Sequence, residues 1–144
     1  MPTLKLTLDM DPPRTTHQQK KARIVKTGNT VKPMFYEPDA LRMARREYML
    51  RLARLKPDEP IKGPVKLITI FSYKAKTKKQ NGQPKVTRPD TDNMIKLLKD
   101  CMTACGFWED DSQVYDDRVI KRYSERPCVN IEITWGEEIK ERDI

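Results

Sequence analysis

The apolar residues of the chain recur with a period of two in several segments, which is typical of half-buried strands. Residues 3–8 alternate polar and apolar positions, and residues 22–36 predict a hairpin. Residues 65–73 are apolar and β-branched enough for a central strand. Residues 114–123 and 129–135 predict two more strands, close enough along the chain to form an antiparallel pair. Together these segments predict a mixed β-sheet.

Two other segments carry apolar residues at helical spacing. Pro38 begins the first helix, in the first-turn position that proline tolerates, and Pro57 lies beyond its end. The second helix runs from Asp90 to Cys105 and ends at Gly106, the usual residue just past a helix C-terminus. The apolar stripes are Leu41, Ala44, Tyr48, Leu52 and Leu55 in the first helix, and Met94, Leu97, Leu98, Cys101, Met102 and Cys105 in the second. Helices placed between strands in this order predict an α+β fold with two main helices.

The composition narrows the number of domains and the kind of partner. A chain of 144 residues suits one domain, expected at residues 1–136, followed by a charged tail at 137–144. The formal charge of +8 and the pI of about 9.4 favour nucleic acid, because each phosphate neutralised by Lys or Arg releases a counterion. A membrane surface is also acidic, but the chain has no long apolar run and its N-terminus lacks a signal-peptide pattern. We therefore expect nucleic acid as the partner, with no membrane partner.

The cysteines predict a reducing compartment. Cys101, Cys105 and Cys128 are odd in number and show no paired spacing, and a single His17 does not complete a zinc set with them. Cys101 and Cys105 fall on the apolar stripe of the second helix, so we expect small core residues. The chain is expected to be intracellular, with free thiols.

The segment from residue 74 to residue 89 is strongly cationic and has almost nothing to bury. It predicts a mobile loop that contacts DNA phosphates, although an ordinary solvated connection would explain the composition equally well. Residues 14–21 form a second polar and basic loop, to which the sequence assigns no role. The candidate DNA contacts are Lys74, Lys76, Lys78, Lys79, Lys85 and Arg88.

Two aspartates at the start of the second helix are candidate metal ligands. Asp92 and Lys96 are four residues apart, so their side chains are expected to meet, and a surface ion pair is the simpler explanation. Asp90 would point about 200° away from Asp92 on a regular helix, so we expect it at the N-cap. There it either accepts a backbone N–H or turns outward beside Asp92, with Arg88 and Lys96 balancing the charge. Clustered carboxylates need a cation between them, and hard oxygen ligands suit Mg²⁺.

A second acidic group lies in the turn at residues 109–111. Phe107 and Trp108 come directly before it and are expected to anchor the turn in the core. By spacing alone, these acids could serve only as caps of a loop. Asp116 and Asp117 follow on the next strand, where alternation sends them to opposite faces.

Two stretches of the chain resemble the motifs of the RusA-type Holliday junction resolvases. They are residues 88–96 (Arg-Pro-Asp-Thr-Asp-Asn-Met-Ile-Lys) and residues 106–114 (Gly-Phe-Trp-Glu-Asp-Asp-Ser-Gln-Val), within a similar region of roughly residues 86–123. The resemblance implies a homodimeric, Mg²⁺-dependent endonuclease, with Mn²⁺ as an alternative metal and no small-molecule cofactor. Its implied substrate is branched DNA, namely four-way junctions cut by paired nicks in recombination and repair.

The same resemblance implies roles for individual residues. By position, Asp90, Asp92 and Asp111 correspond to the catalytic carboxylates that bind the metal, and Lys96 to the catalytic lysine. Asp110 matches the other acid of the doubled pair and is a further candidate ligand.

Two other functions stay open on the sequence alone. A non-catalytic, structure-specific DNA-binding protein would need the same charge of +8 and would use its acids only in caps and ion pairs. A related nuclease acting on flaps or forks would share the metal site.

Overall fold

A computed structural model describes residues 2–14, 21–27, 30–36 and 38–136. The elements in chain order are β1 (Thr3–Leu8), β2 (Lys21–Thr27), β3 (Thr30–Tyr36), α1 (Asp39–Ala53), β4 (Val65–Lys74), α2 (Thr91–Cys105), the 3₁₀ helix η2 (Asp111–Gln113), β5 (Val114–Ser124) and β6 (Cys128–Trp135). The mixture of one larger sheet with two main helices confirms the predicted α+β class.

Four strands form the main sheet, in the order β1-β6-β4-β5. β6 runs antiparallel to both β1 and β4, whereas β5 runs parallel to β4 and is reached from it through α2. The predicted antiparallel pairing of the last two strands is therefore wrong, because β5 and β6 lie on opposite sides of β4. β4 is the strand with the most buried residues and pairs along both edges, while β5, which carries several charged residues, lies at the edge of the sheet.

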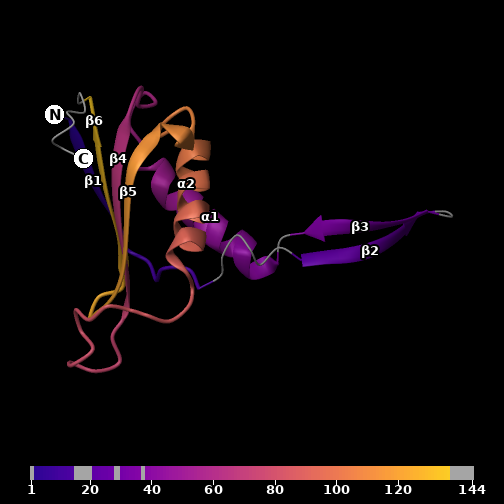
Figure 1. The fold of residues 1–144 in the computed structure, drawn as a ribbon, viewed down its shortest axis with the longest axis horizontal. Coiled ribbons are helices and arrows are strands. Elements are labelled where there is room, and N and C mark those ends of the chain that lie inside the picture. Colours follow the sequence, from indigo (N-terminus) through magenta and orange to yellow (C-terminus); the bar gives the residue numbers. More distant parts are fainter. Residues whose placement is uncertain (1, 15–20, 28–29, 37, 137–144) are drawn as a thin grey trace.

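Both helices cover the same face of this sheet (Figure 1). Alternate residues of β4, among them Leu67 and Phe71, are buried in the same hydrophobic core as Tyr48 of α1 and Leu98 of α2. Burying each large apolar side chain contributes about 1.5–3 kcal/mol. The core thus fixes α2 against the sheet, and α2 carries half of the candidate site.

The predicted hairpin is confirmed as β2 and β3, which form a separate two-stranded sheet. Figure 1 shows it projecting from the rest of the molecule, beyond α1. The described residues do not include the predicted turn residues 28–29, the predicted loop residues 15–20 with His17, or the predicted tail at 137–144.

The helix ends agree with the sequence in part. Pro38 is the N-cap of α1 rather than its first helical residue, and Leu55 lies past the helix and is 38% exposed. Gly106 ends α2 with a φ of 88°, a left-handed conformation that glycine adopts at little cost. Cys101 is buried on the predicted stripe, Cys105 is partly buried, and none of the three cysteines, which lie within the described part of the chain, forms a disulfide. No helix in the described part of the chain is long and apolar enough to cross a membrane.

The cationic segment between β4 and α2 is held by backbone hydrogen bonds to the outer edge of β5. The Gly82 N–H donates to the Tyr123 carbonyl at 2.8 Å, the Tyr123 N–H donates to the Gln83 carbonyl at 2.9 Å, and the Lys85 N–H donates to the Lys121 carbonyl at 3.1 Å. Residues 82–85 therefore lie along the outer edge of β5, with an isolated bridge between Pro84 and Arg122. These bonds also cover an edge that would otherwise be open to another strand.

Candidate active site

Asp90 and Asp92 lie at the start of α2 with exposed side chains. Asp90 is the N-cap residue, as predicted, and its backbone carbonyl accepts the N–H of Met94 at 3.0 Å. All residues of α2 are described, and the Asp90 side chain accepts no capping hydrogen bond from a backbone N–H of this helix. Of the two arrangements expected for Asp90, the structure therefore has the outward carboxylate. Both acids also lie at the positive end of the helix dipole, which favours negative charge.

Lys96 lies one turn further along α2 and contacts two acids. Its Nζ is 3.1 Å from Asp100 Oδ1 and 4.0 Å from Asp111 Oδ2. Hydrogen bonding and charge interaction with Asp100, with a smaller contribution from Asp111, raise the pKa of Lys96. The predicted contact with Asp92 is wrong: among the described ion pairs Lys96 joins Asp100 and Asp111. Two carboxylates on one side attract the ammonium more strongly than Asp92 does on the other.

The acidic turn is anchored as predicted. Phe107 and Trp108 are fully buried, with their rings edge to face at a centroid distance of 6.5 Å. The Trp108 indole N–H donates to Thr103 Oγ1 of α2 at 2.7 Å, which ties the turn to the helix. The Gln113 amide donates to the carbonyls of Ile61 and Gly63 at 2.9 and 3.0 Å. These contacts hold Asp111 beside Lys96.

The two adjacent aspartates of this turn have different surroundings. Asp110 is the N-cap of η2 and accepts the Ser112 N–H at 2.9 Å, in a capping box completed by Gln113. The hydrogen bond from Ser112 lowers the pKa of Asp110. Asp111 is half-buried and its nearest described cation is Lys96. Asp110 thus fits the alternative reading of this turn, in which an acid serves as a cap, whereas Asp111 has the surroundings of a site residue.

A second lysine–aspartate pair connects α2 to the sheet. Lys99 Nζ is 2.9 Å from Asp117 Oδ2 on the helix-facing side of β5, where Asp117 lies opposite Leu67 of β4. Asp116 shares the other face with Lys66, which confirms the predicted alternation. Sequence reasoning identified neither Lys99 nor Asp100 as neighbours of the site.

Lys121 was also missed, although it lies directly behind Asp90. Its Nζ donates to the carbonyls of Thr87 and Pro89 at 2.6 and 2.7 Å. Burial lowers the pKa of Lys121, and so does the charge of Lys85, while the charge of Asp90 raises it. The strand pattern contained a signal, because alternation places this lysine on the same face as Val119 and Tyr123.

The cationic side chains near the site are of two kinds. Most of the predicted DNA contacts are exposed, namely Lys74, Lys76, Lys78, Lys79 and Arg88. Lys85 is buried instead, at 7% exposure, and its Nζ lies 4.9 and 5.4 Å from the ring centroids of Tyr73 and Tyr123. A lysine over two aromatic faces is held by cation–π attraction and does not present its charge to solvent.

With this geometry established, the sequence model of the endodeoxyribonuclease RusA family matches residues 12–134. The chain belongs to this family. A protein of Lactococcus phage r1t named crossover junction endodeoxyribonuclease rusA is 37% identical over 130 residues, covering 88% of this chain and 93% of the relative. The uncharacterized protein YqaN of Bacillus subtilis (strain 168) is 36% identical over 89 residues, 54% of this chain and 62% of that protein. The crossover junction endodeoxyribonuclease RusA of Escherichia coli (strain K12) is 50% identical over 38 residues, 26% of this chain and 32% of that protein.

The candidate site offers oxygen ligands of the kind that bind a hard divalent cation. The distances between these side chains in the structure do not match a metal site. Asp90, Asp92 and Asp111 offer carboxylate oxygens, the ligands that Mg²⁺ prefers together with water. The side chain of Asp90 is not used by the backbone of α2. Among the described residues, however, no group of three acidic, histidine or cysteine side chains is arranged to hold a metal ion. Asp111 lies nearest to Lys96, one helical turn beyond Asp92.

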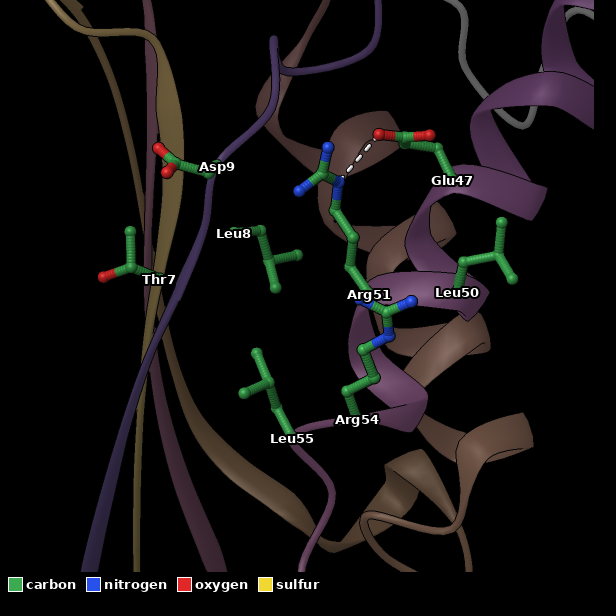
Figure 2. Close-up of a pocket in the computed structure, with 8 residues that line it drawn as sticks. All are labelled: Thr7, Leu8, Asp9, Glu47, Leu50, Arg51, Arg54 and Leu55. Carbon is green, nitrogen blue, oxygen red and sulfur yellow. Dashed lines mark hydrogen bonds and ion pairs between the residues drawn. The ribbon is translucent and has the colours of Figure 1, made fainter.

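A cavity of about 350 Å³ lies elsewhere in the molecule, between the end of β1 and α1. Figure 2 shows Arg51 of α1 pointing into it and hydrogen-bonded to Glu47 at 2.7 Å, with Leu8 and Leu55 on the opposite side. None of the predicted site residues lines this cavity.

Proposed function

We propose that this RusA-family endodeoxyribonuclease resolves four-way DNA junctions by Mg²⁺-dependent hydrolysis of a phosphodiester bond in each of two strands. The observation that carries the proposal is the exposed, outward carboxylate pair Asp90 and Asp92 at the start of α2, with Lys96 and Asp111 on the next turn. The phage relative that aligns over most of its length is named a crossover junction endodeoxyribonuclease, which supports the junction as substrate. Residues 1–136 would form the nuclease domain.

In this proposal Asp90, Asp92 and Asp111 hold the metal, with Mn²⁺ as an alternative to Mg²⁺. When bound, the metal supplies a more acidic water and stabilises the leaving oxygen. Lys96 then offsets negative charge that develops on the phosphate. Asp100 accepts a hydrogen bond from this lysine, which raises the pKa of Lys96 and holds its ammonium in place.

The substrate is held by charges outside the acidic centre. The exposed basic residues would neutralise phosphates on either side of the cut, so that DNA is attracted although the centre itself is negative. We leave Lys85 out of this set because its ammonium is buried between aromatic rings. The proposed contacts are Lys74, Lys76, Lys78, Lys79 and Arg88.

We further propose that the active species is a homodimer acting in the cytoplasm of a bacterial or phage-infected cell. One chain carries one carboxylate centre, and resolution needs two cuts placed symmetrically about the branch point. A two-fold symmetric dimer provides two such centres with matching symmetry. Light scattering of the purified protein at assay concentration would show a monomer mass if this part is wrong.

The deciding experiment is cleavage of a synthetic four-way junction with Mg²⁺, with Mn²⁺ and with EDTA, beside Asp92→Asn. Wild type should nick opposite strands in either metal and be inactive in EDTA. Asp92→Asn should lose cleavage by on the order of a thousandfold or more, since a metal ligand is removed, while still binding the junction. Asp116→Asn, on the opposite face of the sheet, is the matched control and should cleave normally.

The same assay separates the alternatives. A non-catalytic DNA-binding protein would bind with steep salt dependence and never nick DNA in either metal. A flap or fork nuclease would cut three-way or flap substrates faster than four-way junctions. Wild-type cleavage by Asp92→Asn would rule out the proposed site.

A further inference from the structure

Lys121 is a charged residue on the helix-facing side of the sheet. In the parallel register of β4 and β5 it lies opposite Phe71, which is fully buried, so the two side chains point toward the same face. Its ammonium donates to two backbone carbonyls, Thr87 at 2.6 Å and Pro89 at 2.7 Å. Hydrogen bonds from a charged donor are stronger than neutral ones, so this pair of contacts restrains the segment just before α2.

Thr87 is held a second time, through its hydroxyl group. Lys85 Nζ donates to Thr87 Oγ1 at 2.6 Å, and the Lys85 backbone N–H donates to the Lys121 carbonyl at 3.1 Å. The Lys85 ammonium is fixed in turn over the rings of Tyr73 and Tyr123. Lys121 therefore belongs to a hydrogen-bonded group of side chains that joins β4, β5 and the segment before α2.

Asp90 follows Pro89 directly, so the hydrogen bonds from Lys121 to the carbonyls of Thr87 and Pro89, here called the clamp, also affect Asp90. A side chain that capped its own helix would be oriented by that hydrogen bond, but within α2 the Asp90 carboxylate makes no capping bond. Its position therefore depends on the backbone that carries it. That backbone is held from behind by Lys121 through the carbonyl of Pro89.

We propose that Lys121 is a positioning residue of the cleavage site, which orients the Asp90 carboxylate by holding the carbonyls of Thr87 and Pro89. The inference rests on the proposed function, because it takes Asp90 to be a metal ligand. Lys121 does not touch the DNA in this proposal, since two of its three N–H donors are already occupied by protein carbonyls. Groups that orient metal ligands typically change metal affinity or activity by 10- to 100-fold when removed, as an order of magnitude.

Metal affinity distinguishes positioning from a simple charge effect. A lysine ammonium near a cation repels it, so if charge were the main contribution, removing Lys121 would tighten metal binding. If Lys121 positions Asp90, its removal weakens metal binding instead. The sign of the change therefore decides between the two.

The test uses the full-length chain with three variants of Lys121 and one control. Lys121→Met removes both donors and charge, Lys121→Gln keeps N–H donors without charge, and Lys121→Arg keeps both. The control is Lys5→Met, at an exposed lysine of β1 outside the site. Calorimetric titration with Mn²⁺ in the absence of DNA should show affinity about tenfold weaker for Met than for wild type, with Arg within about threefold. Single-turnover cleavage at saturating junction should fall about 10- to 100-fold for Met and be largely restored by Arg, with Gln between them. Junction affinity in EDTA should stay within about twofold throughout, and thermal unfolding identifies any variant that is not folded.

Several results would overturn the inference. Unchanged or tighter Mn²⁺ binding by Lys121→Met would exclude positioning, as would an Arg variant no better than Met. A loss of cleavage that follows weakened junction binding in EDTA would make Lys121 a DNA contact. If Met does not fold, the comparison of Arg with Gln decides: positioning predicts weaker Mn²⁺ binding for Gln than for Arg, whereas a charge effect predicts tighter binding for Gln. Failure of the proposed function is distinct: wild type would then neither bind Mn²⁺ at this site nor cleave, and Asp90→Asn would change nothing.

Discussion

The start of α2 and the acidic turn before β5 both present aspartates to the same side of the molecule, but they hold them in opposite ways. At the start of α2 the Asp90 carboxylate is left outside the hydrogen bonds of the helix, and a lysine fixes the backbone behind it. In the turn, a carboxylate oxygen of Asp110 accepts the Ser112 N–H, so this side chain caps the turn. Asp111 alone remains directed at Lys96.

Because of this difference, not every aspartate near the candidate site is equally able to bind a metal. A carboxylate that accepts a backbone N–H stabilises the turn, as N-caps do, and has less capacity for a cation. A carboxylate without that bond is costly to place near other acids unless a cation or a lysine offsets its charge. The two neighbours Asp110 and Asp111 therefore divide the work, one holding the turn and the other facing the site.

The comparison is broken most directly by exchanging Asp110 and Asp111 for asparagine, one at a time. Asp111→Asn should reduce single-turnover junction cleavage by on the order of a hundredfold to a thousandfold, because a charged metal ligand is lost. Asp110→Asn should stay within a few-fold of wild type, because asparagine caps a helix as well as aspartate does. Rates at saturating junction, measured in Mg²⁺, provide the readout.

The control for this pair is Asp110→Ala, which removes the cap. It should lower thermal stability with a smaller loss of activity than Asp111→Asn causes. Equal and large losses in Asp110→Asn and Asp111→Asn would show that the turn contributes both acids to the metal, as the doubled-acid motif allows.

The cationic segment offers a second and weaker way to sharpen the comparison, because it should bind DNA without contributing to the acidic centre. Changing Lys76, Lys78 and Lys79 together to Gln should weaken junction affinity on the order of tenfold. The slope of log affinity against log salt concentration should become shallower by up to about 0.9 per lost phosphate contact. The cleavage rate of bound junction should change little. Fluorescence anisotropy across a salt series measures both quantities.

A matched control changes three exposed lysines away from this segment to Gln, namely Lys5, Lys56 and Lys62. This control has the same net charge as the loop variant. If this triple variant loses as much salt dependence as the loop variant, the effect is one of overall charge. An unchanged slope in the loop variant would mean that the segment does not touch DNA.

Most elements of the fold were predictable because periodicity reports which face of a segment is buried. The stripe of α2, its end at Gly106 and the anchoring of the turn by Trp108 are all as expected. Periodicity does not report which strand lies beside which, so the short connection from β5 to β6 suggested a hairpin where β4 intervenes. Likewise, a run of lysines describes side chains and contains no information on the backbone bonds that tie Gly82 to Tyr123.

The site was predictable where a single element defines it and less so where two elements meet. Helical spacing placed Asp90 at the cap and Asp92 with Lys96 near it, but could not choose between the acids on either side of Lys96. That choice depends on Asp111, which is brought beside α2 only in the folded chain. Lys121 depends on β5, and a strand lysine between Val119 and Tyr123 is informative only once the face of that strand is known.

The smallest expected effect concerns acid stability at Asp110. Its pKa is lowered in the folded chain by the hydrogen bond from Ser112, so the native state favours the ionised carboxylate. The resulting stabilisation is fully present above the pKa of the unfolded chain, about 3.9, and is lost as the pH falls through the lower folded value. Asparagine at this position keeps the cap and does not titrate. Thermal unfolding of wild type and Asp110→Asn between pH 6 and pH 3 should therefore show wild type losing slightly more, by about 1 °C in Tm, since the group is fully exposed and its contribution is small. Parallel curves for the two proteins over that range would mean that the Ser112 hydrogen bond does not distinguish the ionised from the protonated acid.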